Sequence, residues 1–153
     1  MAASKKNKKV KQGENPGERS VIRTENPDAY YYQHPAWSFA DADNEEWALS
    51  KTCAGDVWWD GILPKLKEWE RVKWKDVLIG TNNHLVDVQK LNPCARKRLL
   101  ELRIEQESLV SLRFQGVHRI YGYMVGNVFH IVWYDPNHGD NDACVCRSHK
   151  KHT

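Results

Sequence analysis

The chain has 153 residues, of which 41% are hydrophobic and 28% are charged, with a net charge of +3 at pH 7. This length suits one domain with a buried core, and no apolar run reaches the roughly 18–20 residues that a membrane-spanning helix needs. The basic start, Met1 to Gln12, lacks the apolar stretch of a signal peptide, and the four cysteines are too few and too uneven for a disulfide scaffold. We therefore expect a cytoplasmic protein with reduced thiols and no membrane contact.

Charge is distributed unevenly along the chain. Residues 1–24 contain seven bases and two acids, residues 25–60 contain eight acids and one base, and residues 61–153 contain fifteen bases and ten acids. The first segment has too few apolar residues to offset the entropy of folding, so we predict a disordered basic tail over 1–24 that either contacts nucleic acid or only keeps the protein soluble. Residues 25–153 then form a single domain, in which the acidic segment either makes a separate face or masks a basic one.

Residues 25–60 are rich in aromatic side chains, prolines and Asp or Asn. This composition predicts short or irregular elements whose rings pack on the rest of the domain, with a ligand-stacking surface as the alternative. Residues 56–107 are predicted to be helical. Apolar residues recur there at spacings of three and four from Trp59 to Val72, and Pro64 predicts either a kink or a new helix start.

The second part of the helical region contains two further signals. A short helix is predicted over 74–79, followed by a polar linker over 81–91. Asn92 and Pro93 are typical of an N-cap followed by a proline in the first helical position, which predicts another helix from there to about Glu107.

From residue 108 the apolar period changes to two, over the region 108–153. Three β-rich runs, Leu109–Phe114, His118–Val125 and Val128–Tyr134, are separated by short turns that contain glycine. Strands so closely linked form an antiparallel meander. We therefore predict an α+β fold with the helices packed on one face of a small antiparallel sheet, and a basic C-terminus with a short edge strand over 143–147.

One face of the predicted sheet collects side chains that can bind RNA. Alternation along the strands places Arg113, Arg119, Tyr121, Tyr123 and His130 on the same side, although the pairing register decides whether they meet. Aromatic rings can stack on bases and arginines can bind phosphates, so this pattern favours an RNA site. The alternative is an exposed polar face with ordinary cross-strand pairs.

The C-terminal tail is a second candidate. His149 and His152 could act as general acids, and Lys150 and Lys151 could bind phosphate, if the tail folds back onto the sheet. The alternative is a frayed basic terminus.

A zinc site is a further possibility at this end of the chain. Cys144 and Cys146 precede His149 and His152, but both spacings are shorter than those of common zinc sites. The sequence also contains no phosphate-binding glycine loop, no nucleophile elbow and no signature of paired carboxylates. We therefore expect neither a metal nor a cofactor.

The strand region resembles the second half of RelE/ParE-type toxins. The resemblance covers roughly 92–153 and depends on Leu112-Arg113-Phe114, His118 to Tyr123, Asn127 to Trp133 and the His/Lys-rich end. In that family a long helix precedes a curled antiparallel sheet, and an arginine opens the segment that resembles Arg119-Ile120-Tyr121. Its ribonuclease members cleave mRNA, mostly at the ribosome and without a metal, whereas ParE-type members act on gyrase. The N-terminal 90 residues exceed what these compact toxins carry.

The resemblance implies a role for particular residues. Arg119 would stabilise the crowded phosphate, Arg113 would be a second anion contact, and His149 or His152 would be the general acid. A base would activate the ribose 2′-hydroxyl.

The function implied is that of an RNA-cleaving toxin of the toxin–antitoxin type, a metal-independent endoribonuclease. Its partners would be RNA, including ribosome-bound mRNA, and a cognate antitoxin. The family pattern leaves Glu101 and Glu105 open as the base. The sheet and tail residues expected to bind RNA are Tyr121, Tyr123, His130, Lys150 and Lys151. The alternatives are a non-catalytic RNA- or protein-binding module that uses the same basic face, and a zinc-stabilised adaptor.

Overall fold

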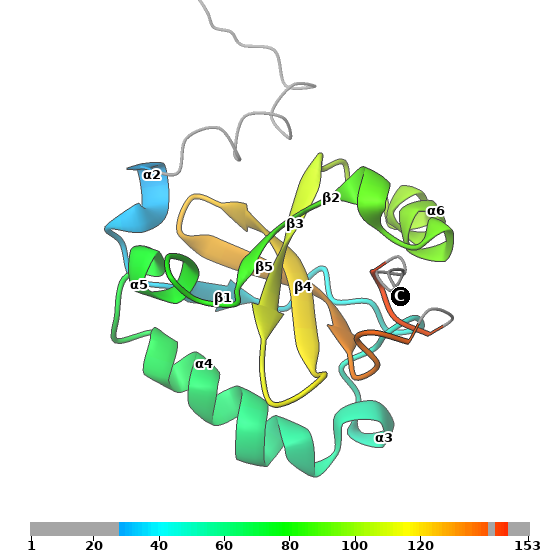
Figure 1. The fold of residues 1–153 in the computed structure, drawn as a ribbon, viewed down its shortest axis with the longest axis horizontal. Helices are drawn as coiled ribbons and strands as arrows, with labels where there is room; N and C mark the ends of the chain where they lie inside the picture. Colours follow the sequence, from blue (N-terminus) through cyan, green and yellow to red (C-terminus); the bar gives the residue numbers. More distant parts are fainter. Residues whose placement is uncertain (1–27, 141–142, 147–153) are drawn as a thin grey trace, which may run out of the picture.

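A central sheet organises the molecule (Figure 1). The computed structural model describes residues 28–140 and 143–146. Three consecutive strands form an antiparallel meander: β3 (Ser108–Arg113), β4 (Arg119–Val125) and β5 (Val128–Asp135). The predicted meander and the α+β class are therefore confirmed.

Two short strands that the sequence pattern does not predict extend the meander at its edges. β2 (His84–Asp87) pairs antiparallel with β3, and β1 (Ala36–Ser38) pairs parallel with β5. The strand order is β1-β5-β4-β3-β2, so the sheet is mixed rather than purely antiparallel. β2 lies within the segment expected to be a polar linker.

Helices cover both faces of the sheet, whereas the sequence pattern places them on one. On the first face, the π-helical turn η4 (Trp58–Ile62) continues into α4 (Leu63–Trp69), and α5 (Trp74–Leu78) follows. On the second face lies α6 (Pro93–Leu102). The remaining short elements are α2 (Asp28–Tyr31), α3 (Lys51–Ala54) and η5 (Val88–Lys90).

Each face of the sheet therefore has its own hydrophobic core. Along β4, Ile120 and Met124 point into the first core, against η4, α4 and α5, while Tyr121 points into the second core, against α6. The second core also contains Cys144 and Cys146 from the C-terminal segment. Because the central strands are covered on both sides, most of their side chains are buried.

The ends of α6 differ in how well they could be predicted. Asn92 caps the helix as expected, since its side-chain oxygen accepts a hydrogen bond from the backbone N–H of Cys94 at 2.8 Å. The helix ends at Leu102 and not near Glu107, because Arg103 adopts the left-handed conformation with a φ of 61°. None of the helices in the described residues has the length and apolar composition needed to span a bilayer.

The acidic segment between β1 and α3 is anchored to α6 by Asp43. This residue is 2% exposed, and its carboxylate accepts two hydrogen bonds from the Arg98 guanidinium at 2.8 Å and one from Trp133 Nε1 at 3.0 Å. Burial alone would raise the pKa of Asp43, but these bonds and the backbone N–H groups of Glu45 and Glu46 hold that pKa well below its ordinary value.

Most of the early aromatic side chains pack as predicted, but Tyr32, Phe39 and Trp59 remain exposed. The centre of the Trp37 ring lies 5.5 Å from that of Trp74 and 5.8 Å from that of Phe129, and both pairs meet edge to face. Phe39 and Trp59 are 47% and 65% exposed.

Candidate functional site

The five predicted sheet residues do share one face, but the middle of that face is covered. Tyr121 has no exposed surface, and its hydroxyl lies 2.7 Å from Cys146 Sγ. Burial, followed by the neighbouring thiol of Cys146, raises the pKa of Tyr121. A ring enclosed in this way cannot stack on a base, so Tyr121 is a packing residue and the expected RNA contact is wrong for it.

At one end of the face, Tyr123 and His130 interact with Asp41. The two rings stack at 4.9 Å with an angle of 9° between their planes. The Tyr123 hydroxyl donates a short hydrogen bond to the Asp41 carboxylate, and His130 Nδ1 lies 3.7 Å from the same oxygen. Burial first, and Asp41 second, raise the pKa of Tyr123. Because these ring faces are already stacked on each other, they offer little surface to a base.

At the other end of the face, two arginines lie directly opposite each other on adjacent strands. Arg113 ends β3 and pairs in register with Arg119 at the start of β4. Arg113 is exposed, whereas Arg119 is 9% exposed. Burial and the charge of Arg113 lower the pKa of Arg119. Like charges placed directly opposite on a sheet are destabilising, and within residues 28–140 and 143–146 neither guanidinium lies within ion-pair distance of a carboxylate. Asp135, the partner of Arg119 on β5, offsets part of this repulsion, because its charge acts to raise the pKa of Arg119.

Arg119 has a structural task at this position. Its Nη1 donates hydrogen bonds to the backbone oxygens of Gly116, at 2.7 Å, and His118, at 3.1 Å. These bonds hold the turn between β3 and β4. Arg113 is therefore the arginine free to approach a ligand, while Arg119 supplies a fixed positive charge beside it.

Arg113 also lines an open groove of about 380 Å³ between α4, the loop before β2 and the end of β3, which we call the Arg113 groove. Lys65 Nζ lies 5.8 Å from the centre of the Trp69 ring on its wall. The position of Arg113 is fixed through its backbone N–H, which donates to Asn83 Oδ1 at 2.7 Å, and Asn83 in turn donates to the backbone oxygen of Val77 at 2.8 Å. The side chains that line the groove are Lys65, Trp69, Thr81, Asn82, Asn83, Arg113, Phe114 and Gln115.

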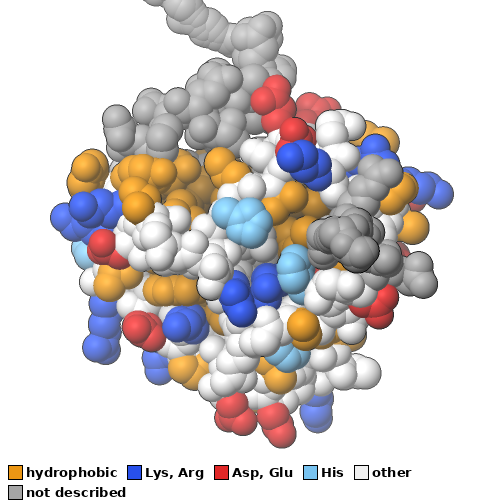
Figure 2. Space-filling model, in the orientation of Figure 1, with side chains coloured by type: hydrophobic (Ala, Val, Ile, Leu, Met, Phe, Trp, Pro, Cys, Tyr) orange, Lys and Arg blue, Asp and Glu red, His pale blue; other side chains and the backbone are white. Residues whose placement is uncertain are grey.

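The composition of the Arg113 groove suits a nucleic-acid strand. Two cations can contact phosphates, and amide side chains can hydrogen-bond to base edges. The Trp69 ring already contacts Trp37, Phe114 and Lys65. Figure 2 shows Lys, Arg and His side chains gathered near the middle of the molecular face that it draws. Sequence reasoning missed Lys65 and Trp69, whose only signal is their spacing of four on one predicted helix.

Two histidines near the arginine pair could move protons. His84 is exposed on β2 opposite Ser111, so it lies on the same face as Arg113 and diagonal to it, a separation of about 7–8 Å in antiparallel sheets. His118 Nδ1 lies 2.8 Å from the Tyr134 hydroxyl, and the His118 ring stacks on the Tyr134 ring. Because 81–91 reads as a linker, the sequence gives no reason to place His84 beside the arginines.

The start of the C-terminal tail is held close to this region. Val145 N–H donates to the buried carboxylate of Asp135 at 2.8 Å, and Cys146 forms an isolated bridge with Leu91 where the edge strand is expected. The positive charge of Arg119 acts to lower the pKa of the Cys146 thiol, against the effect of burial. His149, His152, Lys150 and Lys151 lie outside the described residues.

The candidate base Glu101 and the candidate metal ligands Cys144 and Cys146 are bound within the protein. Glu101, one of the two open bases, binds Arg98 at 2.9 Å. Burial raises the pKa of both the Cys144 and Cys146 thiols, and Cys144 donates to the backbone oxygen of Cys146. The described part of the chain contains no cluster of three or more metal-binding side chains.

Comparisons of the chain with protein-family models, with curated proteins and with solved structures found no match.

Proposed function

We propose that this protein binds single-stranded RNA in the Arg113 groove and cleaves it without a metal ion, as the ribonuclease members of the RelE/ParE-type toxins do. The observation that supports this most is the exposed Arg113 at the edge of an open groove, opposite Arg119 and without an ion pair to a carboxylate within the described residues. This arrangement disfavours folding and favours binding of an anion.

The chemistry would follow the ordinary cleavage of RNA by its own 2′-hydroxyl. A base removes the 2′-hydroxyl proton, the oxygen attacks the adjacent phosphorus, and the 5′-oxygen leaves with a proton from a general acid. The products are a 2′,3′-cyclic phosphate and a free 5′-hydroxyl. Arg113 would contact the phosphate, Arg119 would add a fixed positive charge, and His84 replaces Glu101 as the candidate base. His149 or His152 would be the acid.

In the cell, such an activity would arrest growth by degrading mRNA, and a cognate antitoxin would be required to restrain it. We test this by controlled expression in a bacterial host, with growth and mRNA integrity followed together. Arrest and mRNA loss are expected for the wild type, and Arg113→Ala should relieve both. Lys97→Ala, which removes an exposed cation from α6, is the matched control and should remain toxic.

The purified protein gives a second, direct test. It should cleave a short single-stranded RNA in the presence of EDTA and leave a cyclic phosphate end. Cleavage that requires added magnesium, or undiminished cleavage by a folded Arg113→Ala variant, would contradict the proposal.

A non-catalytic RNA-binding module is the second candidate. The commitment of Arg119 Nη1 to two backbone oxygens favours it, because that nitrogen is then occupied before any phosphate arrives. Tight RNA binding without any cleavage would identify this function.

A further inference from the structure

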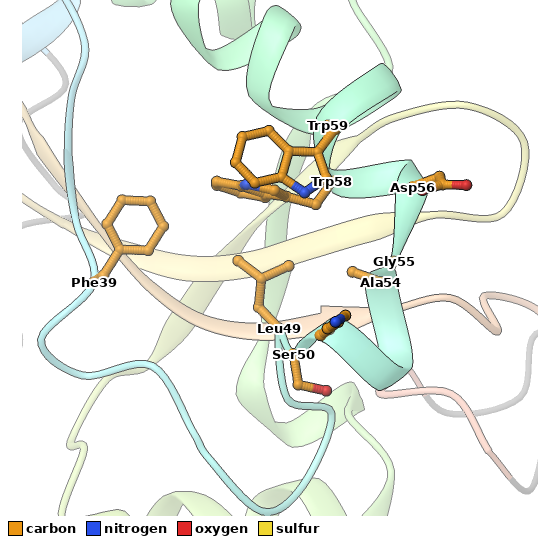
Figure 3. A pocket seen from close by; sticks show the side chains of 9 residues that line it. Phe39, Leu49, Ser50, Ala54, Gly55, Asp56, Trp58 and Trp59 are labelled. Carbon is orange, nitrogen blue, oxygen red and sulfur yellow. The ribbon is translucent and has the colours of Figure 1, made fainter.

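A second cavity, of about 620 Å³, lies beside α3 and η4, and we call it the Trp cavity. Its walls are mainly aromatic and apolar. In Figure 3 the rings of Trp58 and Trp59 lie together, with Phe39 to one side of them and Leu49 below. The volume falls within the roughly 300–1,000 Å³ typical of small-ligand sites.

The aromatic side chains of the Trp cavity are exposed to a degree that packing does not explain. Trp59 is 65% exposed and Phe39 is 47% exposed, although both lie at the same hollow. The Phe39 and Trp58 rings meet edge to face at 6.0 Å, which leaves their other surfaces to the cavity. Large apolar side chains gathered at a hollow in this way mark a ligand site more often than an isolated exposed residue does.

The local backbone helps to hold these rings in place. Trp58 and Trp59 belong to η4, a π-helical turn, which is rare and occurs often at functional sites. A π-helix has more residues in each turn than an α-helix, so consecutive side chains point in more similar directions. Both tryptophans consequently line one cavity.

The charges at the Trp cavity indicate the kind of ligand. Lys51, the one base in the acidic segment 25–60, lines the cavity. Asp56 also lies at its edge, but Figure 3 shows the carboxylate directed away from the aromatic rings. The cavity therefore offers aromatic surfaces and one cation, which suits a planar ring that carries a negative charge.

The Trp cavity is also close to the Arg113 groove. Gly61 of η4 lies against Gln115, since a Cβ atom at Gly61 would be 3.8 Å from Gln115 Oε1, and Gln115 lines the groove. Lys65, on the groove wall, follows Trp59 by six residues, or about 9 Å along a helix. A strand of several nucleotides can contact both sites at once, as single-strand sites usually cover about 4–16 nucleotides.

We propose that the Trp cavity binds one nucleobase, stacked on Trp58 and Trp59, with the attached phosphate near Lys51. For a base within an RNA strand, this inference rests on the RNA binding proposed for the Arg113 groove. A free mononucleotide presents the same chemistry from another source, so both are tested.

The experiment measures binding and not cleavage. A labelled eight-nucleotide single-stranded RNA is titrated with the full-length protein by fluorescence anisotropy, and AMP and UMP are titrated by calorimetry. Loss of one base stack by substitution weakens binding roughly 5- to 150-fold, so Trp59→Ala should weaken RNA binding by a factor in this range. Leu100→Ala, which removes a side chain from α6 that is 76% exposed, is the control and should bind as the wild type does.

Each outcome separates this inference from the function on which it rests. Unchanged RNA binding by both Trp59→Ala and Phe39→Ala overturns the nucleobase site and leaves the Arg113 groove intact. Binding of a mononucleotide that Trp59→Ala abolishes, without any RNA binding, supports the nucleobase site and overturns the proposed function. Binding of neither ligand overturns both.

Discussion

The molecule contains two arginine sites that differ in how their charge is balanced. Arg98 is surrounded by carboxylates, with Asp43 at 2.8 Å, Glu101 at 2.9 Å and Glu45 at 3.4 Å. Arg113, in contrast, lies opposite another arginine, Arg119, beside an open groove. At the first site three carboxylates neutralise the guanidinium. At the second, Asp135 lies opposite Arg119 on β5, but Arg113 has no ion pair within the described residues. The first site therefore serves the fold, and the second is available for a ligand.

The Arg98 site explains what the acidic segment does. The sequence leaves open whether residues 25–60 mask a basic face. Asp43 binds Arg98 and Trp133, and Asp41 binds Tyr123, so two of the acids in this segment are used to hold it against the second face of the sheet. Other elements form the Arg113 groove, and the described part of the segment contributes no lining residue to it.

The largest effect is expected from breaking the Arg98 site. Asp43→Ala leaves Trp133 Nε1 and two backbone N–H groups without their acceptor, whereas Arg98 keeps Glu45 and Glu101 as partners. A buried donor that loses its acceptor costs about 1–3 kcal/mol. We expect the free energy of unfolding in urea to fall by about that amount. A decrease below about 1 kcal/mol would show that the carboxylate is not an anchor.

The pH dependence of stability sharpens the same point. The pKa of Asp43 in the folded state lies well below its ordinary value of 3.8, so the unfolded state takes up the proton first as the pH falls. The stabilisation is thus fully present above about pH 4 and is lost progressively below it. Asp43→Asn should show a smaller loss of stability between pH 4 and pH 2 than the wild type. Parallel curves for the two proteins would contradict this assignment.

The Arg113 site is expected to respond to substitution through binding and not through stability. Arg113→Ala should weaken binding of a single-stranded RNA about 10-fold, because a charged hydrogen bond is typically stronger than about 1.5 kcal/mol. It should also reduce the slope of log affinity against log salt by about 0.7, the contribution of one phosphate on a single strand. Titrations at several salt concentrations measure both quantities, with Lys97→Ala as the control. An unchanged slope would place the phosphate elsewhere.

The sequence predicted those parts of the fold that depend on local patterns. The meander follows from alternation over six to eight residues and from turns at Gly116 and Gly126, both of which have positive φ. β1 could not be predicted, because three residues carry no periodicity and its partner, β5, is about 90 residues away. The end of α6 at Arg103 was hidden for a similar reason, since no glycine marks its left-handed residue.

The pairing of Arg113 with Arg119 in the candidate site was predictable from the sequence, but the packing of other elements around the pair was not. Strand alternation correctly places Arg113 and Arg119 on one face, and the register confirms that they are neighbours. Whether that face is open depends on how α6 and the C-terminal segment pack, and this buries Tyr121. The groove beside Arg113 needs Lys65 and Trp69 from a helix on the opposite face, which only the three-dimensional arrangement brings to the edge of β3.

The smallest effect on stability is expected when the repulsive arginine pair of the second site is replaced by a pair of opposite charges, as at the first site. Arg113→Glu places a carboxylate directly opposite Arg119 in the existing register, so a repulsive cross-strand pair becomes an attractive one. Such exchanges change stability by about 0.2–1 kcal/mol, and we expect the free energy of unfolding to rise by about 0.5 kcal/mol. RNA binding should fall by more than in Arg113→Ala, since the new charge repels phosphate.

Arg113→Gln is the matched control: it removes the repulsion without adding a partner, so its stability should lie between those of the wild type and Arg113→Glu. A protein that is stabilised and has lost RNA binding would show that the arginine pair costs stability in order to bind an anion. A destabilised Arg113→Glu would mean that the two guanidinium groups do not oppose each other in solution, and the contrast between the two arginine sites would then no longer hold.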